Sequence, residues 1–184
     1  SPFESTPFSM QKITSTLNSV KCEEYSNCLE VTFFGKMWNG SVSTNWNVAN
    51  NWTLSGVPNA THCVIIPNVT NDPIISGTNF DAYANTLSIL NNGKLIINGS
   101  NNLTVTDFVA INGTANLFIE NNASLIQVND SAINTGNIKY TRTSRPITRW
   151  AYVYWGSPVD GNVIGQLPSQ FDLKYRWQSG THDG

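Results

Sequence analysis

The residues that could carry out catalysis are few and widely spaced along the chain. Its two histidines, His62 and His182, are not accompanied by a serine and an acid in a pattern that suggests a catalytic triad. The sequence contains no phosphate-binding glycine loop, zinc-protease motif or EF-hand loop. We therefore predict that the protein is not an enzyme and binds no cofactor and no metal ion. The aspartates are dispersed rather than aligned at one interval, at Asp72, Asp81, Asp107, Asp130, Asp160, Asp172 and Asp183.

Aromatic and basic residues are the better candidates for contact with a ligand. Three of the six tryptophans lie close together, and their spacing fits neither one helix face nor one strand. Their rings suit either a platform that stacks on sugars or a loop that covers one end of a hydrophobic core. We expect that they cover the core. A run of basic residues precedes an aromatic strand. These residues suit either an exposed edge strand that must not pair with other chains or contact with an anionic polysaccharide. The candidate ligand or glycan contacts are Trp38, Trp46, Trp52, Trp150, Arg145 and Arg149.

The three cysteines leave one unpaired if a single disulfide forms. Cys22 and Cys28 are close enough in the sequence to close a small disulfide loop, which an exported protein would permit. Unpaired thiols are an alternative, and Cys63 has no assigned partner. Zinc binding is a weaker alternative, because no second close pair of cysteines occurs and His62 and Cys63 stand at the start of an apolar strand.

Composition and charge narrow the class of protein. Only 12% of the 184 residues are charged, about half the usual share. Lys and Arg number 10 and Asp and Glu number 12, so the net charge of −2 creates no overall field that attracts nucleic acid or an anionic membrane. The apolar runs are too short to cross a bilayer, and we predict no transmembrane segment. Short apolar runs between Gly, Pro and Asn predict an all-β protein.

Residues 61–140 contain a repeat. From Leu87 onward, short apolar runs recur at a step close to eight residues, with Asn- and Gly-rich turns between them. Three such sides make a turn of about 24 residues, as in a β-solenoid whose turns bury their inner faces against each other. The alternative is an antiparallel meander with Asn-Gly hairpins at 92–93 and 112–113. The runs are short for hairpin strands, which favours a solenoid of about three coils. The side chains expected to point inward are Leu87, Leu95, Leu103, Ile111, Leu117, Ile119, Leu125 and Ile133.

The predicted fold is therefore all-β: a short right-handed parallel β-solenoid, or β-helix, with a Trp-rich N-terminal cap, followed by the start of a second β module. Residues 1–36 are assigned to a lead-in or the tail of a preceding β module, and 37–60 to the Trp- and Asn-rich cap. The solenoid spans 61–140, and 141–184 form an aromatic β segment that begins a truncated next module. The chain opens on Ser1 rather than Met, as expected for a processed or truncated product.

Several segments, in this order, resemble a region that recurs in large surface proteins of Bacteroidetes, especially flavobacteria. They are residues 38–41, 50–52, 56–58, 64–67, 123–127, 134–138 and 140–142, followed by the aromatic run 149–159. Such proteins are typically exported by the type IX secretion system, and many are adhesins, some linked to gliding motility. The resemblance implies the same cellular location and export route. The run 130–132 also resembles a short O-glycosylation acceptor of exported Bacteroidetes proteins, which makes Ser131 a candidate for this modification.

Together these features predict a non-catalytic structural or adhesive module of a large cell-surface or secreted protein. The expected location is extracellular, either on the exterior of the outer membrane or released. The expected partners are surface polysaccharide or other cell-surface and secretion-machinery proteins, and not nucleic acid. Two alternatives remain: a carbohydrate-binding module that uses the tryptophans, and a polysaccharide-degrading β-helix enzyme.

Overall fold

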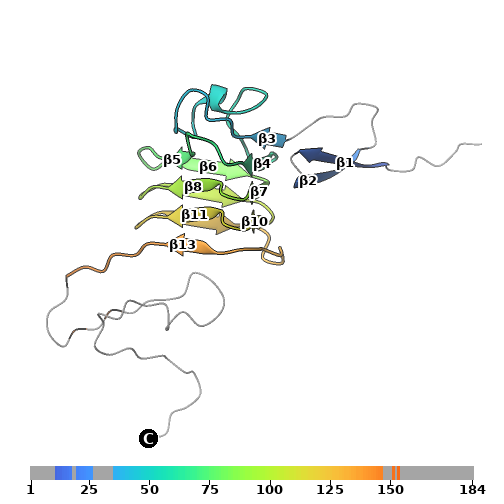
Figure 1. The fold of residues 1–184 in the computed structure, drawn as a ribbon. Helices are drawn as coiled ribbons and strands as arrows, with labels where there is room; N and C mark the ends of the chain where they lie inside the picture. The colour runs from blue at the N-terminus through green and yellow to red at the C-terminus, as the bar shows by residue number, and fades with distance from the viewer. Residues whose placement is uncertain (1–10, 18–19, 27–34, 147–150, 152, 154–184) are drawn as a thin grey trace, which may run out of the picture. The chain divides into compact units, whose positions relative to one another are not determined.

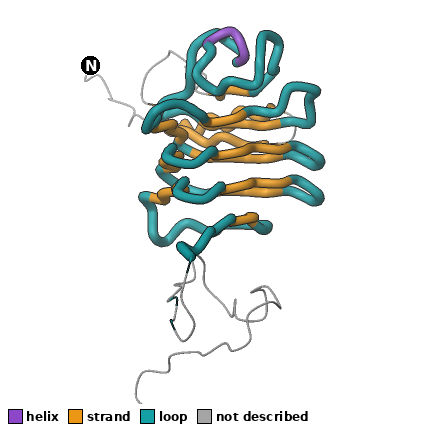
Figure 2. The backbone as a smooth tube through the Cα atoms, turned by 90° about the vertical axis from the view of Figure 1, so that its left-hand side faces the viewer, coloured by secondary structure: helices purple, strands orange, loops and turns teal. Residues whose placement is uncertain are grey.

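The computed structural model describes residues 11–17, 20–26, 35–146, 151 and 153. From residue 35 to residue 140 the chain winds as a parallel β-solenoid, whose strands lie in stacked layers (Figures 1 and 2). β1 (Gln11–Leu17) and β2 (Val20–Ser26) pair separately as an antiparallel hairpin. The described ranges contain one helical element, the short 3-10 turn η1 (Ala49–Asn51), and no helix there is long and apolar enough to span a membrane. The all-β prediction is confirmed.

Three sheets form the sides of the solenoid, and the chain visits them in turn. The β4 sheet contains β3 (Gly35–Met37), β4 (Cys63–Ile66), β7 (Thr86–Ile89) and β10 (Val109–Ile111). The β8 sheet contains β5 (Ile74–Ile75), β8 (Lys94–Ile97), β11 (Asn116–Ile119) and β13 (Ile138–Tyr140). The β9 sheet contains β6 (Asp81–Ala84), β9 (Asn102–Val105) and β12 (Ser124–Gln127).

All strand pairings within these three sheets are parallel, and each layer advances the chain by one coil. Val64 pairs with Leu87 and Leu87 with Val109, so these three residues hold the same place in successive coils. The stack has about four turns rather than the expected three, because the coils are slightly shorter than expected and β3 adds a strand before residue 61. The strands that flank residues 92–93 and 112–113 pair in parallel with strands of neighbouring coils and not with each other. This pairing excludes the antiparallel meander.

The hydrophobic core lies between the three sheets and is built from alternate residues of the strands. In β8, Leu95 and Ile97 are fully buried, while Lys94 and Ile96 are half-buried on the outer face. Leu125 is half-buried and packs against the core. The prediction of inward side chains is confirmed for the residues that are at most 6% exposed, which are Leu87, Leu95, Leu103, Ile111, Leu117 and Ile119.

The same prediction is wrong for Ile133, which is 85% exposed. The eight-residue spacing of the apolar runs is interrupted here, because the chain makes an extra turn between β12 and β13. The residue that returns to the β4 sheet is Thr135, which bridges to Ala110. Gly136 follows with a φ of 87°, and a Cβ at this position would lie 2.3 Å from the carbonyl oxygen of Ile111. The close approach of the last coil therefore requires glycine.

Asparagines stabilise the corners between the sheets. Asn92 and Asn122 adopt left-handed backbone conformations, with φ values of 62° and 65°, which Asn tolerates better than most residues. The side-chain oxygen of Asn91 accepts a hydrogen bond at 3.0 Å from the backbone N–H of Thr114, one coil further along. Asn121 accepts a corresponding bond at another corner. These bonds tie neighbouring coils together in addition to the strand ladders.

The chain divides into two units, residues 1–143 and residues 144–184. The hairpin of β1 and β2 falls in the segment assigned to a lead-in or preceding module. Most of the predicted aromatic segment and second β module at 141–184 lies outside the described residues, so this assignment stays a prediction.

Replacing Leu103 with Ala should lower the free energy of unfolding by about 2–5 kcal/mol, because it leaves a cavity between stacked coils. Urea unfolding followed by circular dichroism measures the loss. The matched control is Ile133→Ala, which should change stability by less than about 0.5 kcal/mol because Ile133 is exposed. Equal losses in the two variants would contradict the inward and outward assignments.

Candidate functional site

Three tryptophans in the cap, residues 37–60, close the N-terminal end of the solenoid. Trp38 and Trp46 are fully buried, and Trp52 is 2% exposed. The ring centroid of Trp52 lies 5.0 Å from that of Trp38 and 4.6 Å from that of Trp46, with nearly perpendicular planes. Such edge-to-face contacts are favourable because the ring edge is positive and its face negative. The rings share one core cluster with the inward residues of β4 and β5.

The cap is also hydrogen-bonded to the first coil. The backbone N–H of Trp38 donates to the carbonyl oxygen of Ile65 at 2.9 Å, and that of Trp46 donates to Ile74 at 3.1 Å. The indole N–H of Trp38 donates to the carbonyl oxygen of Asn71 at 2.7 Å. The cap thus satisfies backbone groups that the open end of the stack would leave unpaired. The predicted Trp-rich cap is confirmed.

Asn51 organises the loop that carries the tryptophans. Its fully buried side chain accepts hydrogen bonds from the backbone N–H groups of Val42 and Ser43, at 2.9 and 3.0 Å. Its amide donates to the carbonyl oxygen of Asn45 at 2.9 Å and to the Ser43 hydroxyl at 3.1 Å. Because every polar atom of this side chain has a partner, its burial costs little and fixes the loop in one conformation.

The burial of the rings corrects one part of the predicted ligand surface. Trp38, Trp46 and Trp52 cannot stack on a glycan, because stacking requires an exposed ring face and theirs are covered. Trp150 and Arg149 lie outside the described residues. Arg145 is exposed, as is Ser131, so both residues are accessible for the roles that the sequence suggested.

A buried lysine is hydrogen-bonded to the backbone of the cap loop. Lys36 is 7% exposed, and its ammonium donates to the carbonyl oxygens of Leu54 at 2.5 Å and Ser55 at 3.2 Å. Burial lowers the pKa of the nearby His62 side chain, and the positive charge of Lys36 lowers it further. The Nδ1 atom of His62 accepts a hydrogen bond from the backbone N–H of Asn59 at 3.0 Å. We assign His62 a structural role in the turn before β4.

Cys63 is disulfide-bonded and 4% exposed in β4. The chain has two other cysteines, Cys22 and Cys28, whose side chains lie outside the described residues. A disulfide of Cys63 within the chain and the predicted disulfide between Cys22 and Cys28 exclude each other, because only one of the other cysteines would remain. The prediction from spacing is therefore wrong, since spacing along the chain does not register contacts that the fold creates.

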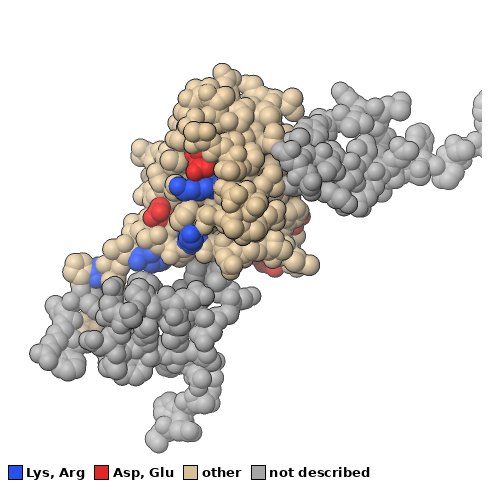
Figure 3. Space-filling model, viewed as in Figure 1, with Lys and Arg blue, Asp and Glu red and all other residues tan. Residues whose placement is uncertain are grey.

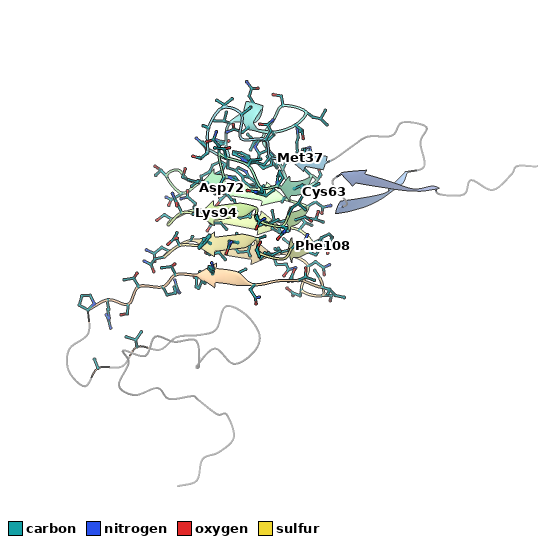
Figure 4. The ribbon with its side chains drawn as sticks, viewed as in Figure 1. Met37, Cys63, Asp72, Lys94 and Phe108 are labelled. Carbon is teal, nitrogen blue, oxygen red and sulfur yellow. The ribbon has the colours of Figure 1, made fainter. Side chains whose placement is uncertain are left out.

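An aromatic ring lies between two lysines on the outer face of the β8 sheet. Phe118 pairs with Ile96 on one side and with Lys139 on the other, so the three residues form one column across the strands. The Nζ atom of Lys139 is 4.8 Å from the Phe118 ring centroid, and that of Lys94 is 5.6 Å away. Lys94 also lies 3.9 Å from a carboxylate oxygen of Asp72 (Figure 4). We call Lys94, Phe118 and Lys139 the Lys–Phe–Lys cluster.

The electrostatics of this cluster are those of a partly neutralised cationic patch. Burial raises the pKa of Asp72, while the positive charge of Lys94 opposes this rise. The side chain of Lys94 remains 40% exposed, and Lys139 is exposed. Ammonium groups over an aromatic face are attracted by the ring quadrupole, which fixes them without neutralising their charge.

The sequence analysis missed the Lys–Phe–Lys cluster because its three members belong to three different coils and are far apart along the chain. The signal becomes visible only when the sequence is written in rows of one coil each, so that Phe118 and Lys139 fall in the same column. Within the described ranges, no group of three or more His, Cys, Asp or Glu side chains is arranged to hold a metal ion.

Comparison with known proteins identifies one related family. A family model described as "Domain of unknown function (DUF8693)" matches residues 37–184, which include the cap and the whole solenoid from residue 61 onward. No curated protein and no solved structure matches the chain.

Replacing Asn51 with Ala should lower the free energy of unfolding by about 1–3 kcal/mol, because it removes the buried side chain that holds part-buried backbone groups of the cap loop. Thermal and urea unfolding measure the change. Asn47→Ala is the matched control, since Asn47 belongs to the same loop but is exposed. An Asn51→Ala variant as stable as the Asn47→Ala variant would show that the buried amide does not hold the cap.

The disulfide of Cys63 predicts that non-reducing peptide mapping will find the Cys63 peptide linked to a peptide that contains Cys22 or Cys28. Cys63→Ser should lower the free energy of unfolding by about 2–5 kcal/mol, mainly because the unfolded chain loses a constraint. A free thiol at Cys63 together with a linked Cys22–Cys28 peptide would contradict the pairing.

Proposed function

We propose that this chain, which belongs to the DUF8693 family, is a non-catalytic structural and adhesive module of a large cell-surface or secreted protein. The observation that carries the proposal is the capped stack of coils, which builds a stiff element from a short chain. Three parallel ladders and the corner asparagines join each coil to the next. Bending the stack would therefore break hydrogen bonds on at least one side, which suits a spacer that holds other modules apart.

Two observations support an extracellular location. Cys63 is disulfide-bonded, and disulfides persist chiefly in exported proteins. The segments that resemble surface proteins of Bacteroidetes fall in the cap, the first and last coils and the following aromatic run, which favours export by the type IX secretion system. Ser131 is exposed in a turn, where an O-linked glycan would not disturb the core.

A carbohydrate-binding module is the second candidate function. The tryptophan platform on which it first rested is buried, but the Lys–Phe–Lys cluster offers a different surface for an acidic glycan. This candidate is compatible with the spacer proposal, because the cluster lies on the outer face of a sheet and leaves the core unchanged.

The location can be tested in the native host with an antibody against residues 35–143. Intact wild-type cells or their culture medium should contain the antigen, and a strain without a functional type IX secretion system should retain it inside the cell. Detection only in the cytoplasm of wild-type cells would contradict the proposal.

The role as a spacer can be tested in the same host by an in-frame deletion of residues 37–143. Adhesion should fall while the remaining protein is still exported, and replacement by a solenoid of similar length should restore adhesion better than a flexible Gly/Ser linker of equal residue number. Equal rescue by the flexible linker would show that stiffness is not required.

A further inference from the structure

The exposed Lys and Arg residues of the described solenoid lie on one of its sides, whereas its acids are shared between two sides. Of the four Lys and Arg residues between positions 35 and 143, one is the buried Lys36. The other three lie on the β8 sheet or directly after its last strand, at Lys94, Lys139 and Arg142. Three of the five acids lie on the β9 sheet or just after its strands, at Asp81, Asp107 and Asp130, and the other two, Asp72 and Glu120, lie at the ends of strands of the β8 sheet. Figure 3 shows Lys and Arg side chains on the face toward the viewer, with Asp or Glu side chains beside them.

The Lys–Phe–Lys cluster concentrates positive charge within that face. Lys94 and Lys139 belong to strands separated by β11, yet both ammonium groups lie within 5.6 Å of the Phe118 ring centroid. Two like charges held near one ring repel each other, and carboxylates that reach the ammonium groups from solvent would reduce this repulsion, as Asp72 already does in part for Lys94. The ring has already ordered both lysine side chains, so less conformational entropy is lost when an anion binds.

We infer that the outer face of the β8 sheet binds an acidic polysaccharide, whose carboxylates are received by Lys94 and Lys139. This inference rests on the proposed function, since it presupposes a protein exposed to extracellular glycans. Across β8, β11 and β13 the two lysines are separated by two strand spacings, about 9–10 Å along the stack at the backbone. An extended polyuronate presents carboxylates at repeated intervals of similar scale, so one chain can reach both ammonium groups.

The same observations argue against the other polyanions. Nucleic acid binding draws on many phosphate contacts, whereas this face offers few cations and the chain has a net charge of −2. Base stacking also requires a free aromatic face, and the ring of Phe118 is approached by both lysines. A weakly charged polymer with one carboxylate per sugar fits this sparse arrangement better.

Binding can be measured with polygalacturonate as the probe, by calorimetry and by affinity gel electrophoresis of the full chain. The double variant Lys94→Gln/Lys139→Gln should weaken binding by about tenfold or more, and binding should decrease steeply with added salt. Circular dichroism and thermal unfolding of the variant should match those of the wild type. Unchanged affinity, equal binding of neutral dextran, or tighter binding of single-stranded DNA would each overturn the inference.

A matched pair of acid variants separates local contact from net charge. Asp72→Asn removes the carboxylate beside Lys94 and should tighten binding by up to about fivefold. Asp130→Asn removes the same charge at an exposed position after β12 and should leave the affinity unchanged. Equal tightening in both variants would show that binding follows overall charge rather than this site.

The role of Phe118 is positioning, and a conservative change tests it. Phe118→Leu keeps an apolar side chain but removes the ring quadrupole, so it should weaken binding by about two- to fivefold, whereas Phe118→Trp should retain it. If both variants bind as the wild type does, the ring does not order the lysines.

The binding assay and the localisation assay fail independently. Polygalacturonate binding by the purified chain that depends on both lysines would support the site even if antibody detection placed the protein in the cytoplasm. Surface exposure without polygalacturonate binding would leave the proposed spacer function intact and remove the glycan site.

Discussion

Each coil of this protein can bury its inner side chains only against the coils above and below it, in parallel register. The length of a coil is therefore nearly constant, because a much longer or shorter one would move inward residues out of the column of their neighbours. Asparagines with left-handed backbone conformations turn the corners without a large steric cost. Where the register is shifted, as before Thr135, an apolar residue such as Ile133 is left in solvent.

The same constraint means that the apolar end of the first coil must be covered, because no further coil packs against it. The cap covers this end with three different kinds of contact. The rings of Trp38, Trp46 and Trp52 cover the apolar end, backbone bonds reach β4 and β5, and the buried amide of Asn51 fixes the loop. Covering the rings in this way removes them from the surface, so the protein cannot use one set of tryptophans both to close the core and to bind sugars.

Stacking also determines what the outer faces can do. Residues that are far apart in the sequence become neighbours at the spacing of one strand, and side chains of modest individual effect can act together. Phe118 and the two lysines on either side of it are an example, since each of the three belongs to a different coil. A scaffold with such a patterned face would combine the proposed support and the proposed binding in one element.

The amino-acid sequence by itself determined the fold class, the inward positions of residues such as Leu95 and Leu103, and the cap. These features depend on local alternation, on turn residues and on apolar rings that must be buried, all of which can be read within a short window. Only the tertiary structure decided the bond of Cys63, the exposure of Ile133 and the Lys–Phe–Lys cluster. The bond of Cys63 depends on a contact between segments that are distant in the sequence. The exposure of Ile133 and the cluster depend on the length of particular coils, where a small insertion or deletion decides which side chains meet.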